Sequence, residues 1–187
     1  EKVRTAPVTA VFLADLEAMR SIDRLVKLEH RAGRPDAYVT HLPASAAVFA
    51  PGSMGLGRSA QDLKRVAASM ASMVTAVPTV NSAEAWAFKH TMLAAGWYML
   101  GAASMGVSTC PMEGFDAARI RRTLRIPDRF EIPTAVATGY ALEGLMRAPR
   151  FPRKEVVFED SFGQDLSPGL EAEEHWGDPV PPDPVTP

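Results

Sequence analysis

The sequence predicts one domain that combines buried strands with helices. Two apolar runs, 7–14 and 133–140, have the composition of strands that are buried on both faces. The stretches 16–31 and 59–75 repeat apolar residues at helical spacing, and the stretch 83–105 is apolar almost throughout. With 187 residues, the chain is long enough to bury one hydrophobic core.

Composition and charge exclude several classes of function. Hydrophobic residues make up 47% of the chain, charged residues 22%, and the net charge is −2. No electrostatic case for binding nucleic acid or an acidic membrane surface follows from these values. Cys110 is the single cysteine, which rules out an internal disulfide and fits a reducing compartment, so we expect a cytoplasmic protein with a buried, inert Cys110. No metal site is expected, because the four histidines stand far apart in the sequence.

The first third of the chain alternates clear periodicity with a stretch that has none. The run 7–14 contains β-branched Val8, Thr9 and Val11, and 16–31 follows it as an amphipathic helix. A chain rarely begins so close to a buried central strand, so we expect further parts of the fold upstream. The stretch 37–57 is rich in proline and glycine and is predicted to be a mobile excursion with the composition of a lid.

The helix predicted at 59–75 has one apolar face. Its members are Leu63, Val66, Ala67, Met70 and Val74.

The long apolar helix 83–105 is the element around which the chain is organised. Asn81 as N-cap with Glu84 three residues later resembles a capping box, and Gly106 stands where a left-handed residue ends a helix. The segment from Thr91 to Met112 has no charge, which raises the possibility of a membrane span. Its many Gly and Ser residues, and the lack of a basic flank after it, argue against one. Small residues on all sides instead predict a helix packed all round, in a large core or an obligate dimer interface.

The segments after this helix are short. Cys110 to Gly114 is predicted to form a turn, and 115–124 a helix whose arginines form a solvated face. A strand follows at 133–140, and a shorter one is expected at 155–158. From Glu159 onward acidic residues and prolines dominate. We therefore divide the chain into a domain, 1–158, and an arm, 159–187, which we expect to wrap a partner subunit.

Three blocks of sequence together resemble one known family. They are AEAWAFKH…GAASMGVSTCPMEGFD, then IP…PTAVATGY, then PRFPRKEVV, in matching order and spacing from about Ala83 to Val157. The opening KVRTAPVTAVFLAD is also similar to the second strand of the family. On these residues the chain is identified as a member of the FMN-dependent nitroreductase family.

The resemblance implies an α+β fold with a mostly antiparallel central sheet flanked by helices, and a long buried helix at a homodimer interface. It also implies an oxidoreductase that passes hydride from NAD(P)H through FMN to nitroaromatics, quinones or similar acceptors. Two alternatives stay open. One is a subunit of this fold that has lost flavin and serves as a structural or assembly protein. The other is a relative with a different outcome, such as reductive dehalogenation or flavin destruction.

By the same resemblance, Pro111, Met112, Glu113 and Gly114 lie against the flavin ring, with Glu113 and Gly114 at its N5 edge. The residue types suit that role, because Pro111 stiffens the backbone and Gly114 lets it approach a planar ligand closely. The backbone N–H groups that open the following helix can meet the negative charge of a reduced flavin.

Arg150 matches the arginine that binds the FMN phosphate in the family, a role that suits the bidentate guanidinium. A second basic residue is often found two positions earlier, where this chain has Ala148, and Arg147 is the candidate replacement. The family's N-terminal phosphate-binding and ring-binding motifs do not occur in the sequence. The resemblance therefore covers the C-terminal two-thirds of the fold.

Overall fold

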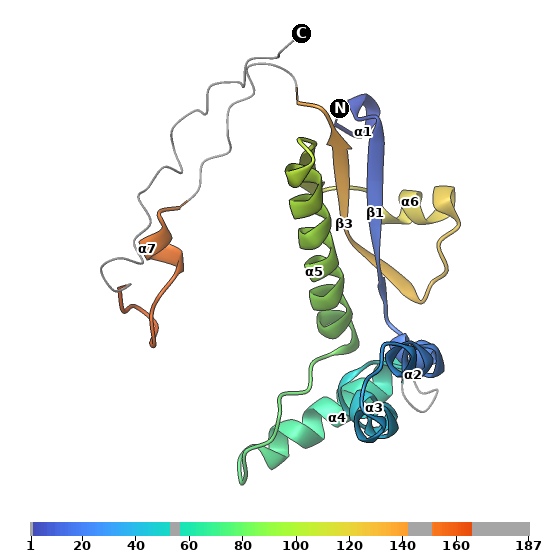
Figure 1. Ribbon diagram of the computed structural model, residues 1–187, viewed down its shortest axis with the longest axis vertical. Helices are drawn as coiled ribbons and strands as arrows, with labels where there is room; N and C mark the ends of the chain where they lie inside the picture. The colour runs from blue at the N-terminus through green and yellow to red at the C-terminus, as the bar shows by residue number, and fades with distance from the viewer. Residues whose placement is uncertain (1, 53–56, 142–150, 166–187) are drawn as a thin grey trace. The chain divides into compact units, whose positions relative to one another are not determined.

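A computed structural model describes residues 2–52, 57–141 and 151–165 of the chain (Figure 1). It divides the chain into two compact units, Glu1–Tyr140 and Ala141–Pro187, and each is described by itself. The predicted boundary between a domain, 1–158, and an arm, 159–187, remains a prediction, because most of the arm lies outside the described residues.

The first unit contains a three-stranded sheet in the order β1-β3-β2. Its strands are β1 (Val8–Asp15), β2 (Ser108–Met112) and β3 (Phe130–Gly139), and both pairings are antiparallel. The central strand β3 is the most buried, with Thr134 and Val136 fully inaccessible. Both apolar runs predicted to be strands are confirmed, and so is the predicted α+β fold with an antiparallel sheet.

Helix α5 (Ala83–Ser104) packs along this sheet and contacts all three strands (Figure 1). The Tyr98 ring meets the Phe12 ring edge to face at 5.6 Å, and its hydroxyl lies 2.8 Å from the Thr138 hydroxyl. The predicted N-cap, Asn81, is wrong by one residue, since the Ser82 hydroxyl accepts the N–H of Ala85 at 3.2 Å. Gly106 ends the helix as predicted, in the left-handed conformation at φ 69°.

The two faces of α5 differ sharply within one chain. Ala83, Ala87 and Ala95 are buried against the rest of the unit, because small side chains let the helix approach the sheet closely. On the outer side Leu93, Trp97 and Leu100 are 64–75% exposed. The expectation of a helix packed all round is therefore not met by the described residues of a single chain, and its position in a dimer interface remains a prediction.

Between β1 and α5 the chain forms a group of helices. After the short α1 (Lys2–Thr5) and β1 come η1 (Ala18–Ser21), α2 (Ile22–Arg31), α3 (Asp36–Phe49) and α4 (Gly57–Ala71). The predicted lid-like excursion at 37–57 is wrong over most of its length, because α3 occupies 36–49 with Pro43 inside it. Ala44, Ala46 and Ala47 have the highest helix propensity, and the structure shows that they outweigh the proline signal.

Helix α3 ends in a tight contact with the start of the helical group. Gly52 has φ 87°, and a Cβ there would lie 2.7 Å from the Cα of Glu17. The backbone of the neighbouring Pro51 accepts a hydrogen bond from the N–H of Met19 at 3.1 Å. Only glycine fits this approach, which joins the end of α3 to η1.

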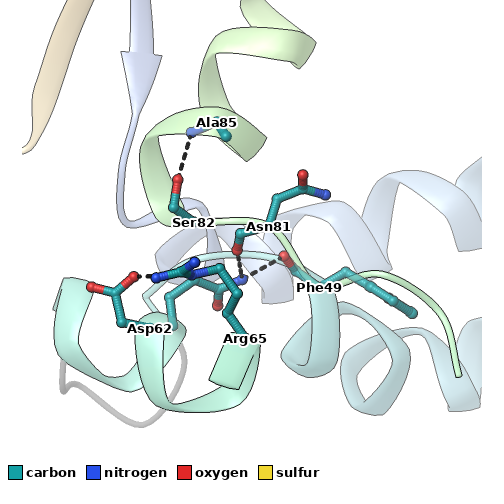
Figure 2. Close-up of polar contacts among 7 residues, drawn as sticks. Phe49, Asp62, Arg65, Asn81, Ser82 and Ala85 are labelled. Atoms are coloured by element: carbon teal, nitrogen blue, oxygen red, sulfur yellow. Dashed lines mark hydrogen bonds and ion pairs between the residues drawn. The ribbon is translucent and has the colours of Figure 1, made fainter. Parts of the chain in front are cut away.

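Helix α4 directs polar side chains inward and apolar side chains outward. Gln61 is fully buried, and its Nε2 donates to the carbonyl oxygens of Phe49, at 3.1 Å, and Asn81, at 2.9 Å (Figure 2). Lys64, one turn later, donates from Nζ to the carbonyl of Ala47 at 2.8 Å. The apolar face that the sequence predicts points outward, with Leu63 70%, Val66 49% and Met70 66% exposed.

The last elements are short. Helix α6 (Ala117–Leu124) confirms the helix predicted at 115–124, and Asp116 caps it by accepting the N–H of Arg119 at 2.8 Å. In the second unit, the strand predicted at 155–158 is wrong, since Arg153–Val156 forms the single-turn helix α7 behind Pro152. Proline at this N-cap position has no N–H to satisfy, which favours the start of a helix.

Candidate functional site

The segment predicted to contact a flavin lies at the edge of the sheet. Cys110, Pro111 and Met112 belong to β2 rather than to a turn, which corrects the prediction. They pair with Ala137, Val136 and Ala135 of β3. Proline favours turns, but it is also accepted on edge strands. In the sheet formed by the described residues, β2 is an edge strand. The turn proper follows at Glu113 and Gly114, immediately before α6.

A buried threonine fixes the end of β2. The Thr134 hydroxyl is fully inaccessible and donates to the carbonyl oxygen of Met112 at 3.1 Å. One residue later the carbonyl of Glu113 accepts the N–H of Phe115 at 3.0 Å, which closes the turn. No signal in the sequence marks Thr134 as a site residue, because a threonine in a buried strand is expected for its β-branched shape alone.

The backbone of this segment is accessible. Pro111, Glu113 and Gly114 are exposed, and a Cβ at Gly114 would meet no described atom within 4 Å. Gly114 does not adopt the left-handed conformation that would by itself require glycine. Among the described residues, therefore, neither backbone conformation nor crowding requires glycine at this position.

The remaining predicted site residues are not brought to this segment by the described structure. Arg150 and Arg147 lie outside the described residues. Cys110 is half-buried in β2, with Sγ 3.8 Å from the carbonyl oxygen of Pro111. In the part of the chain that the structure describes, no three His, Cys, Asp or Glu side chains are grouped as a metal site would need. Of the described helices, none has the length and apolar character to cross a membrane.

Comparison with known proteins identifies the family. The model of the nitroreductase family matches residues 57–140, which include α4, α5, the β2 edge and all of β3. An NADH dehydrogenase of Thermus thermophilus is 31% identical over 157 residues, or 83% of this chain and 62% of that protein. Over residues 57–140 the chain matches the nitroreductase family. This confirms the resemblance found in the sequence.

Other nitroreductases match shorter stretches of the chain. The putative NAD(P)H nitroreductase MhqN of Bacillus subtilis is 40% identical over 70 residues, which are 37% of this chain and 34% of that protein. The chain therefore spans less than two-thirds of the length of the curated relatives it matches, at 62% and 34%.

Solved structures agree on the fold. A putative nitroreductase in complex with FMN from Exiguobacterium sibiricum has a TM-score of 0.58 at 16% identity, covering 83% of this chain and 63% of that one. A nitroreductase family protein from Streptococcus pneumoniae has a TM-score of 0.57 at 17% identity, covering 84% and 66%. At these identities the likeness shows the nitroreductase fold alone.

Proposed function

We propose that this chain is part of an FMN-dependent oxidoreductase that transfers hydride from NAD(P)H to nitroaromatic, quinone or similar acceptors. The observation that carries the proposal is the exposure of Pro111, Glu113 and Gly114 at the sheet edge, inside the region that matches the family. Bound FMN would supply the two-electron transfer between nucleotide and acceptor. The protein supplies position, hydrogen bonding and a partly dry surface.

The described residues fit a flat ligand. Open space around Gly114 lets the backbone meet a planar ring, and the bond from Thr134 to Met112 holds that backbone in place. A rigid edge strand keeps a ligand group in one orientation better than a loop does. Arg150 is the proposed partner of the FMN phosphate. A charged hydrogen bond of this kind is typically worth about 1.5–3 kcal/mol.

Titration of the apo-chain with FMN tests the phosphate role. Arg150→Ala is expected to weaken FMN binding by one to two decades with little change in thermal stability. Arg24→Ala, an exposed arginine of α2, is the matched control and should leave FMN affinity unchanged. Equal affinity for wild type and Arg150→Ala would remove Arg150 from the site. A colourless chain that fails to bind FMN at all would favour the flavin-free structural alternative.

The Glu113–Gly114 turn allows a sharper test of how the site acts. If backbone faces the ring, Glu113→Gln should keep flavin reduction within about tenfold, or ~1.4 kcal/mol. Gly114→Val should lose flavin or activity while the fold is kept, because the valine side-chain carbons would take the space of the ring. Stopped-flow reduction by NAD(P)H and reoxidation by a quinone, across pH, measures both. A loss of about a hundredfold or more confined to Glu113→Gln would instead make its carboxyl a general acid.

The proposed enzyme is a homodimer with the outer face of α5 in its interface. The exposed Leu93, Trp97 and Leu100 follow each other at helical spacing on that face. Burial at ~25 cal/mol per Å² makes such a contact obligate rather than transient. Sedimentation at micromolar concentration checks this, and a monomer there would contradict it.

A further inference from the structure

The hydroxyl of Thr134 is bonded to the peptide group that leads into the Glu113–Gly114 turn. Thr134 is fully buried in β3, and its Oγ1 donates to the carbonyl oxygen of Met112 at 3.1 Å. The planar unit that contains this carbonyl also contains the N–H of Glu113. None of the described peptide bonds is cis, and in a trans peptide the C=O and the N–H point in opposite directions. The N–H of Glu113 is therefore directed away from the buried Thr134.

The two N–H groups of the turn can donate to a ligand. Glu113 and Gly114 are exposed, and none of the described residues accepts a hydrogen bond from the N–H of either. A Cβ at Gly114 would meet no described atom within 4 Å, so the space beside the turn is open. Backbone N–H groups are strong donors, and two of them beside open space fit the electron-rich edge of a flavin ring.

A side chain controls the first of these donors. The Glu113 N–H shares its peptide group with the carbonyl of Met112, which accepts the Thr134 hydroxyl. The Gly114 N–H shares its peptide group with the carbonyl of Glu113, which accepts the N–H of Phe115 at 3.0 Å, a backbone donor. A hydrogen bond to a carbonyl polarises the whole peptide group, so the N–H of that group becomes a stronger donor.

We infer that Thr134 is a positioning residue whose hydroxyl, acting through the Met112–Glu113 peptide, strengthens binding of reduced FMN more than binding of oxidised FMN. The inference rests on the proposed function, because it requires that the turn meets the ring. The ring of reduced FMN is negatively charged and the oxidised ring is neutral, and hydrogen bonds to an anion are stronger than those to a neutral acceptor. A donor that is both oriented and polarised therefore favours the reduced form.

Thr138 offers a matched comparison on the same strand. It is half-buried, its hydroxyl lies 2.8 Å from the hydroxyl of Tyr98, and it donates to the carbonyl of Val136 at 3.4 Å. These contacts lead to α5 and along β3, whereas the Thr134 hydroxyl is bonded to the end of β2. Loss of either hydroxyl removes hydrogen bonds from the core, but loss of the Thr134 hydroxyl alone should change the turn.

Potentiometric titration of bound FMN, combined with titration of the apo-chain with oxidised FMN, tests the inference. Thr134→Val keeps the β-branched shape and removes the hydroxyl. It should keep the dissociation constant of oxidised FMN within about threefold and raise that of reduced FMN by about tenfold. The reduced form then loses at least about threefold more affinity, which lowers the midpoint potential of the two-electron couple by about 15 mV or more. Thr134→Ser keeps the hydroxyl and should keep the wild-type potential.

Amide NMR of the apo-chain measures the polarisation without any flavin. Thr134→Val should move the Glu113 amide nitrogen resonance upfield, and Thr134→Ser should restore it. The Gly114 amide resonance should stay in place, because its peptide group is polarised by the backbone of Phe115. An unmoved Glu113 resonance in Thr134→Val would overturn the inference.

Thr138→Val is the control for a purely structural role. Urea unfolding should show a loss of stability in Thr134→Val and in Thr138→Val, whereas the potential should fall in Thr134→Val alone. A wild-type potential in Thr134→Val, or a lowered one in Thr134→Ser, would overturn the inference and leave the proposed function standing. A wild-type chain that fails to bind FMN would overturn the proposed function, and the inference with it.

Discussion

Helices α4 and α5 bury opposite kinds of side chain. Helix α5 buries three alanines against the unit and the sheet, and leaves Leu93, Trp97 and Leu100 outside. Helix α4 buries an amide and leaves its largest apolar side chains outside. In α5 the alanines face inward because small side chains let the helix approach the sheet closely. In α4 the polar side faces inward because carbonyl oxygens at the end of α3 need hydrogen-bond donors.

The difference shows that an apolar stripe does not by itself decide which side of a helix faces inward. The last carbonyls of α3 have no intrahelical partner, and unpaired carbonyls are costly to bury. Gln61 and Lys64 supply the donors, so polar groups settle the orientation. The apolar side is then left for another surface.

The largest loss of stability is expected from an amide placed on the buried side of α5. Ala95 is 0% exposed. Ala95→Gln should lower the free energy of unfolding by about 3–5 kcal/mol, through overpacking and an unpaired amide. Ala94→Gln, on the exposed side one residue away, should change it by less than about 0.5 kcal/mol. Urea unfolding of both variants measures this, and equal effects would contradict the assignment of faces.

A smaller effect is expected from removing the amide of α4. Gln61→Met deprives the carbonyls of Phe49 and Asn81 of their donor, but it also removes an amide oxygen that no described residue contacts. We expect a net loss of about 1–2 kcal/mol in the free energy of unfolding. Asp62→Met is the neighbouring control, with only an exposed ion pair to lose. A stabilised Gln61→Met variant would show that apolar packing alone could hold α4.

The smallest effect is a pH dependence from Lys64. Desolvation by burial lowers the pKa of Lys64 below its ordinary value of 10.5. The unfolded chain therefore binds this proton more readily than the folded one, and folding gains stability as pH rises through the lowered folded pKa toward 10.5. Wild type should gain stability relative to Lys64→Met over that alkaline range. Parallel unfolding curves of the two proteins at each pH would contradict the burial of this side chain.

The sequence anticipated those parts of the fold that depend on local pattern. The apolar runs became β1 and β3, and the long uncharged segment became α5, because period and composition act within each segment. Helix α3 was missed because its proline and glycine signals were weighted above its alanines. The side of α4 that faces inward could not be predicted from its own sequence, because it depends on carbonyls of α3, a helix that the sequence pattern did not predict.

The candidate site was anticipated only in position. Pro111 and Met112 form the end of an edge strand, since pairing with Ala135 and its neighbours outweighs the proline signal, and the turn is confined to Glu113 and Gly114. The hydrogen bond from Thr134 to Met112 joins residues 22 apart in sequence, so the local pattern of neither segment predicts it. Arg150 lies outside the described residues, so its role rests on the resemblance and on the titration proposed above.

The proline in β2 has one further consequence. An outer strand with a regular row of N–H and C=O groups is a template on which other strands can add, including those of misfolded chains. Pro111 lacks the N–H, and proline on an edge strand interrupts such a row. Strands of misfolded chains therefore add poorly to this edge of the sheet. The edge can stay accessible to a ligand without promoting aggregation.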